Sequence, residues 1–205
     1  MFVITADQVD SRSEPDIVGG TLAGLNERYG ERLALPVDRN AGDEIQALTS
    51  DPRAALDLVL ELTRNGAWSV GLGCGSVRAP LPAETREASG DAFIAARNAV
   101  TRAKRTTTRF AVDALTDPLA AEDAEAILNL LLTIREGRSP AGWELYDLVA
   151  SGLTQADAAA RLGITPQSAS DRARASGLRV ELAATGALTR LLQSLDDAQL
   201  RTDTA

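Results

Sequence analysis

The residues of this chain best placed for a chemical role, by their type and spacing, are acidic side chains at the ends of short β-prone segments. Asp7 follows the apolar run 2–6, and Asp43 lies in a glycine-containing turn between two further strand-like segments. Carboxylates on neighbouring strands are ligands that Mg²⁺ prefers, and a bound Mg²⁺ in turn holds a triphosphate. The pattern therefore predicts a Mg²⁺ site at Asp7 and Asp43. The simpler alternatives are that Asp43 is an ordinary turn residue and that Asp7 caps a helix or pairs with Arg12.

The histidine and cysteine content excludes several kinds of catalytic and metal site. Histidine is absent from the 205 residues, and cysteine occurs once, at Cys74. This excludes triads that need histidine, multi-cysteine metal clusters and an internal disulfide. A single thiol fits a reducing cytoplasm, the opening residues lack the apolar core of a secretion signal, and no stretch reaches the about 18–20 apolar residues of a membrane span. We therefore expect a cytoplasmic protein without a membrane segment, with Cys74 as a small buried apolar side chain.

A second pattern, in residues 154–176, is typical of two short helices joined by a tight turn. Thr154 and Thr165 are N-cap candidates, and a proline follows the second of them. Gly163 stands where the turn needs a left-handed residue, and alanines on the facing sides allow a close crossing. The pattern predicts a helix-turn-helix with 166–174 as its recognition helix. It is similar to the helix-turn-helix of bacterial transcription regulators and of the promoter-reading domain of sigma factors.

Polar side chains on the second of these helices can contact double-stranded DNA. Glutamine pairs with adenine, arginine with guanine, and serine with phosphates or base edges. The net charge of −8 requires such contact to be local, and Arg172, Arg174 and Arg179 outnumber Asp171 along this edge. A helical hairpin that only packs or dimerises is the alternative. The expected DNA-binding residues are Thr165, Gln167, Ser168, Ser170, Arg172 and Arg174.

The elements that must position these residues divide the chain into an α+β part, 1–118, and an all-α part, 119–205. In the first part, strand and helix periods alternate in the order strand, helix, hairpin, helix, strand, helix, strand, which is a ferredoxin-like arrangement. Glycines alternate at 71, 73 and 75 in one strand, which indicates close packing of a helix on the sheet or contact with a ligand. The predicted strands are 2–6, 33–37, 44–48, 68–77 and 109–114, and the predicted helices are 16–29, one opened by Asp51-Pro52, and 90–105.

The second part has only helical periods, and Thr116-Asp117-Pro118 is the predicted boundary. Trp143 and Tyr146 stand at helical spacing and are expected in the core of this part. The polar tail from Asp196 is expected to fray. The predicted helices are 122–135, 143–150, 154–162, 166–175 and 181–195.

The first part resembles the class III nucleotidyl cyclases and, more closely, the SatD-like proteins of bacteria. The resemblance is carried by residues 4–12, 41–48, 70–77 and 90–100, within 1–115. It implies a cyclase-like α/β sandwich followed by the helix-turn-helix domain. It also implies that Asp7 and Asp43 are metal ligands.

Two arginines acquire a predicted role from the same resemblance. In the cyclases a substrate-selecting lysine stands four residues before the hairpin aspartate, which is the position of Arg39 here, and Arg97 matches an arginine that stabilises the transition state. Both are therefore expected to bind a nucleotide. Phe93 stands where the cyclases have an asparagine, and loss of such a donor typically costs about a hundred- to a thousand-fold in rate. Pairing of Arg97 with Asp91 on its own helix is the simpler alternative.

Together these patterns favour a homodimeric DNA-binding transcriptional regulator. Its cyclase-like part senses a nucleotide ligand or mediates dimerisation, and Mg²⁺ is the only cofactor expected. The first alternative is a divalent-metal-dependent nucleotidyl cyclase or another nucleotide-processing enzyme. The second is an interaction module in which neither part binds DNA or a small ligand.

Overall fold

A five-stranded mixed sheet and eight α-helices make up the α+β fold in the computed structural model, which describes residues 1–40 and 42–203. The chain packs as two units: unit 1 contains residues 1–129 and the chain from Leu188 onward, and unit 2 contains residues 130–187. Among the described residues, no helix is both long and apolar enough to span a bilayer. Helices α4 and α8 each contribute residues to both units.

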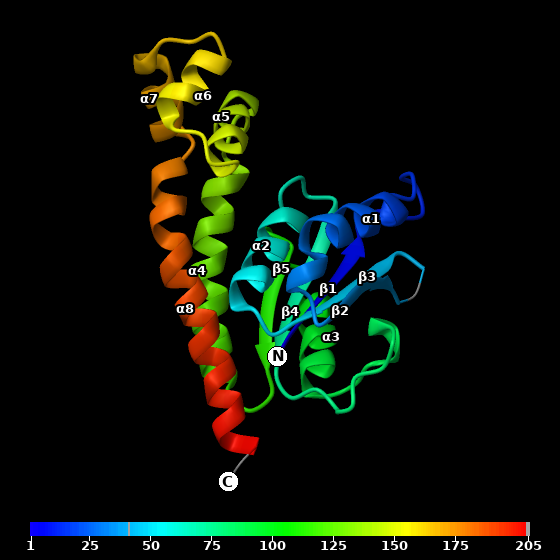
Figure 1. Cartoon of the computed structure of the whole chain (residues 1–205). Helices are drawn as coiled ribbons and strands as arrows, with labels where there is room; N and C mark the ends of the chain where they lie inside the picture. Colours follow the sequence, from blue (N-terminus) through cyan, green and yellow to red (C-terminus); the bar gives the residue numbers. More distant parts are fainter. Residues whose placement is uncertain (41, 204–205) are drawn as a thin grey trace. The chain divides into compact units, whose positions relative to one another are not determined.

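The sheet of unit 1 has the strand order β2-β3-β1-β4-β5 (Figure 1). Its central strand β1 runs antiparallel to both β3 and β4, β2 is antiparallel to β3, and β4 is parallel to β5. This register places Asp7 at the end of β1, directly opposite Glu44 of β3 and Ser69 of β4. The strands are β1 Phe2–Gln8, β2 Leu35–Arg39, β3 Glu44–Thr49, β4 Trp68–Cys74 and β5 Phe110–Ala114.

Helices cover both faces of this sheet. Helices α1 and α2 lie on one face and α3 on the other (Figure 1). Asp51 caps α2, because its carboxylate accepts a hydrogen bond from the Arg53 amide at 2.8 Å. The helices are α1 Val18–Tyr29, α2 Pro52–Leu62, α3 Asp91–Ala103, α4 Pro118–Glu136, α5 Pro140–Ala150, α6 Gln155–Arg161, α7 Pro166–Ala175 and α8 Leu178–Asp203, with short 3-10 turns η1 Gly30–Arg32 and η2 Thr85–Glu87.

The alternate glycines of β4 let α3 approach the sheet at backbone contact distance. A Cβ on Gly71 would lie 2.2 Å from the backbone nitrogen of Val100, and one on Gly73 would lie 2.2 Å from the carbonyl oxygen of Ala92. The facing side of α3 is correspondingly built from fully buried alanines. Close helix packing, one of the two roles predicted for these glycines, is therefore confirmed.

The polar tail predicted to fray from Asp196 is instead helical up to Asp203, and Asp196 itself is 7% exposed; residues 204–205 lie outside the described part of the chain. The Asp196 carboxylate accepts hydrogen bonds from the Met1 amine and from the thiol of Cys74, the latter at 3.7 Å. Burial raises the pKa of the Cys74 thiol to about 12, and the Asp196 charge acts in the same direction. Cys74 is buried as expected, and the polar tail supplies a buried partner that hydropathy alone does not reveal.

Unit 2 encloses a small alanine-rich core between α5, α6 and α7. Leu145, Ala158, Ala159, Ala169 and Ala173 are buried together, and Leu162 and Ile164 pack against them. Trp143 and Tyr146, which are partly buried, form an edge-to-face pair with ring centroids 5.4 Å apart. Small side chains on both α6 and α7 therefore set their close approach.

Substitution of Gly73 by alanine tests the contact between β4 and α3. The added methyl group meets backbone atoms at 2.2 and 2.3 Å, and forced overpacking of this kind typically costs about 1–3 kcal/mol in the free energy of unfolding. Urea denaturation of the full chain measures that loss. Gly20→Ala, on α1 with no atom within 4 Å of its new Cβ, is the matched control and should be neutral or slightly stabilising. Equal stability of the two variants would contradict the packing described.

Candidate functional site

The two predicted metal ligands lie at the same end of neighbouring strands. The amide of Gln8, which follows Asp7, donates to the carbonyl oxygen of Asp43 at 3.0 Å. The hairpin between β2 and β3 is therefore anchored to the end of β1. Because this backbone hydrogen bond joins the two segments, Asp7 and Asp43 both lie at the end of the sheet where β1 ends and β3 begins.

Each of these carboxylates has a partner within the protein. The Asp7 carboxylate accepts a hydrogen bond from Lys104 Nζ at 2.7 Å, so the ion pair predicted with Arg12 is wrong. The hydroxyl of Ser11 donates to Asp43 and holds the pKa of that carboxyl below its usual range, with Lys104 and Arg12 adding longer-range attraction. Groups of three or more acidic or cysteine side chains able to hold a metal are absent from the described residues. The two predicted metal ligands are therefore each bound to a different side chain of the protein, Asp7 to Lys104 and Asp43 to Ser11.

Glu44 is a buried acidic residue in the same region that the sequence does not single out. It lies opposite Asp7 in the sheet and is 5% exposed. Its carboxylate accepts hydrogen bonds from Arg97 Nη2 at 2.9 Å and from the side-chain nitrogen of Asn40, Nδ2, at 2.6 Å. The predicted pairing of Arg97 with Asp91 is therefore wrong, because α3 directs Arg97 across the sheet instead of along its own helix.

The two predicted nucleotide-binding arginines lie in different clefts, each of about 330 Å³. Arg39 contributes to the first cleft and forms a 2.6 Å ion pair with Asp16, which lowers the pKa of that carboxyl. Arg97 contributes to the second cleft. The first cleft, which we call the Asp43 cleft, is lined by Gln8, Ser11, Asp16, Arg39, Gly42 and Asp43; the second, the Arg97 cleft, is lined by Asn40, Gln46, Arg86, Ala88, Phe93, Ile94, Arg97 and Asn98.

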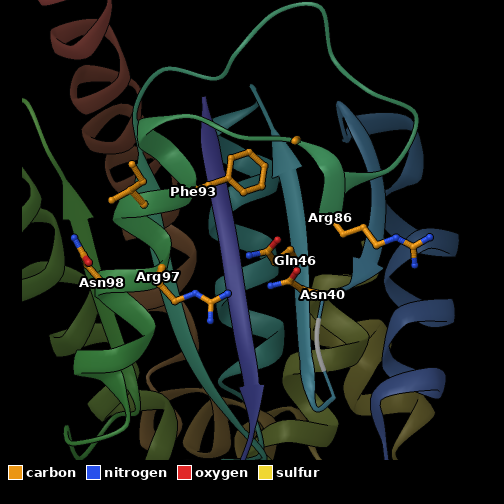
Figure 2. A pocket seen from close by; sticks show the side chains of 8 residues that line it. Asn40, Gln46, Arg86, Phe93, Arg97 and Asn98 are labelled. Atoms are coloured by element: carbon orange, nitrogen blue, oxygen red, sulfur yellow. The ribbon is translucent and has the colours of Figure 1, made fainter.

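The Arg97 cleft combines a ring, amides and a guanidinium group. The Arg97 side chain reaches from α3 across β1 towards Asn40 and Gln46 (Figure 2). The Phe93 ring projects from the same helix, four residues earlier, in the same direction over the sheet. Phe93 offers a flat apolar face and no hydrogen-bonding group, which favours stacking of a planar ligand over stabilisation of a developing charge.

The polar side chains of α7 lie on the surface. Thr165, Gln167 and Arg174 are exposed, and Ser168, Ser170 and Arg172 are half-buried. The hydroxyl of Thr165 accepts from the Ser168 amide at 3.1 Å, so it serves as the N-cap of the helix. The structure therefore keeps all the predicted DNA-binding residues on or near the surface of unit 2.

Acidic or polar groups accompany the arginines of this surface. Arg174 pairs with Asp171 at 2.6 Å, and Arg172 lies 3.6 Å from Glu144 of α5. Arg179 donates to the side chain of Gln155 at 3.0 Å. The edge is consequently less positive than the arginine count of the segment 165–179 indicates.

Lys104, Ser11 and Glu44 complete the site in unit 1, and none of them was predicted. Lys104 is the single lysine of the chain, which is a composition signal of its own. The pairing of Asp7 with Glu44 follows from the register of the hairpin. An explicit register for the strands predicted at 2–6 and 44–48 would have placed Glu44 beside Asp7.

Comparison with known proteins gives no relative: no family model, no curated protein and no solved structure matches this chain.

Replacement of Ser11 by alanine tests the geometry at Asp43. Without the donated hydroxyl the charged carboxylate loses its strongest stabilising contact, so the pKa of Asp43 should rise towards its ordinary value. Carboxyl carbon chemical shifts followed by NMR against pH measure this change. Ser13→Ala removes a nearby hydroxyl that donates to the carbonyl oxygen of Asp10 and should leave Asp43 unchanged. An Asp43 pKa that does not respond to loss of Ser11 would rule out the contact.

Proposed function

We propose that this chain is a DNA-binding transcriptional regulator whose α6 and α7 form a helix-turn-helix. In this function α7 is the recognition helix and double-stranded DNA is the partner. The observation that carries the proposal is the combination, within one short segment, of a tight two-helix crossing and an uncovered polar helix face.

The turn between α6 and α7 supports this proposal. Gly163 adopts φ +65°, a left-handed conformation that favours glycine. The Thr154 side chain accepts from the Asp157 amide at 3.1 Å and Thr165 accepts from the Ser168 amide, so both helices begin at defined caps. The buried alanines on the facing sides bring the helices together. These features match the requirements of a DNA-reading pair of helices.

The strand order of unit 1 supports a ferredoxin-like, cyclase-like layout for the sensing part. The order β2-β3-β1-β4 is antiparallel throughout, as in a split β-α-β arrangement, and β5 joins in parallel through α3. We propose that this part is SatD-like, that it binds a nucleotide with the arginines at 39 and 97, and that it mediates dimerisation. A homodimer would present two recognition helices to half-sites about one helical turn apart.

Replacement of Arg172 and Arg174 by alanine tests DNA binding by α7. Loss of two cationic contacts should weaken binding at least ten-fold and reduce the slope of log affinity against log salt by about two. Electrophoretic mobility shifts on duplexes recovered by the wild-type chain measure both quantities. The matched control is Arg53→Ala with Arg190→Ala, which changes the net charge equally but lies in unit 1. Unchanged binding by the α7 variant would refute the assignment.

A divalent-metal-dependent nucleotidyl cyclase is the second candidate function. The hydrogen bond between Gln8 and Asp43 favours it, because it brings both predicted metal ligands to one edge of the sheet. Against it, Phe93 supplies no donor in the Arg97 cleft, and Lys104 and Ser11 already occupy the two carboxylates.

Incubation of the full chain with Mg²⁺ or Mn²⁺ and each nucleoside triphosphate separates the two functions. The regulator account predicts nucleotide binding without turnover, measured by calorimetry and by chromatography of the products. A cyclic nucleotide product that disappears in Asp7→Asn would establish the enzyme instead.

A further inference from the structure

One row of side chains on α7 points directly away from the core of unit 2. Gln167, Asp171 and Arg174 follow each other at positions i, i+4 and i+7, which lie on one face of an α-helix. The opposite face carries Ala169 and Ala173, both fully buried. We call these three side chains the outer ridge of α7. A helix that enters a DNA groove with its buried side against its own domain presents this ridge first.

A carboxylate occupies the middle of the outer ridge and is bonded from both sides. Arg174 Nη2 donates to Asp171 at 2.6 Å, and Gln167 Nε2 donates to it at 3.3 Å. The side chains of Arg174 and Asp171 are 81% and 49% exposed, so this pair lies at the surface and is available to a ligand. Asp171 therefore orients both neighbours and neutralises the most exposed cation of the helix.

An aspartate at this place is unfavourable for contact with the DNA backbone. Phosphates repel a carboxylate, and a neutralised arginine gains less from them, so a helix face of this kind favours weak binding to DNA of arbitrary sequence. A carboxylate becomes favourable only where a base offers a hydrogen-bond donor in the major groove. Two bases offer such a donor, cytosine at N4 and adenine at N6; the N7 acceptor beside adenine N6 repels a carboxylate, so aspartate pairs with cytosine N4.

We propose that Asp171 determines the sequence specificity of α7. It accepts a hydrogen bond from cytosine N4 at one base pair of the target site and restrains Arg174 from contact with phosphates elsewhere. This inference rests on the proposed DNA-binding function. It adds the identity of one base that α7 recognises and a reason for low affinity towards other sequences.

Parallel selection from a randomised duplex library by the full-length wild type, Asp171→Ala and Glu136→Gln tests the proposal. Alanine favours the helix, so the first substitution should preserve folding, which circular dichroism verifies. Glu136→Gln is the matched control because it removes one exposed acidic charge from α4 without touching α7. The wild type and the control should select the same motif. Asp171→Ala should select that motif with the preference for cytosine lost at one position, from about ten-fold to near one.

A second measurement follows the restraint on Arg174. For a fixed duplex of unrelated sequence, Asp171→Ala should bind about two- to five-fold more tightly and show a salt slope steeper by about one. An unchanged slope would remove the restraint from the proposal.

The outcomes separate this inference from the function on which it rests. A motif selected by the wild type and retained with full cytosine preference by Asp171→Ala overturns the role of Asp171 and leaves DNA binding intact. Uniformly weaker binding with the same motif also overturns it, because that result describes a structural residue. Failure of the wild type to select any motif overturns both.

Discussion

Unit 2 is organised around one buried carboxylate shared by two buried guanidinium groups. Glu181, near the start of α8, is 1% exposed and accepts from Arg135 at the end of α4 and, at 2.6 Å, from Arg138 in the following turn. The rings of Trp143 and Tyr146 lie 4.3 and 4.5 Å from the Arg138 guanidinium carbon. Removing one partner of such a buried pair typically costs about 3–5 kcal/mol, a large part of a total stability of about 5–15 kcal/mol.

This cluster explains how a small domain with few large apolar side chains keeps a defined shape. Arg138 Nε donates to the carbonyl oxygen of Ser176, the residue that ends α7, at 3.0 Å. The same guanidinium group thus fixes the end of α7 and binds Glu181 of α8. Its Nη1 is buried without a hydrogen-bond partner among the described residues, and the two rings compensate the charge through cation–π contact. The C-terminal end of α7 is consequently held by a buried side chain, which suits the proposed readout of a DNA groove.

The sequence predicted helices and strands well wherever the hydrophobic periodicity and the capping or turn residues indicate the same element. The strands, the caps at Asp51, Thr154 and Thr165, and the glycine turn at 163 follow from local rules that tertiary contacts do not override. Ion-pair partners were predicted poorly, because Asp7 and Arg97 pair with Lys104 and Glu44, which are distant in sequence. The length of α8 was underestimated for the same reason. Asp196 is polar and near the end of the sequence, but its hydrogen-bond partners, the Met1 amine and the Cys74 thiol, are distant in sequence.

Recovery of DNA by the intact chain tests the central claim most directly. Purified protein is mixed with fragmented genomic DNA of the organism that encodes it, with and without Mg²⁺ and nucleotides, and the retained fragments are sequenced. The regulator account predicts enrichment of a recurring motif with two related half-sites about one helical turn apart. Retained fragments distributed like the input under every condition would contradict it.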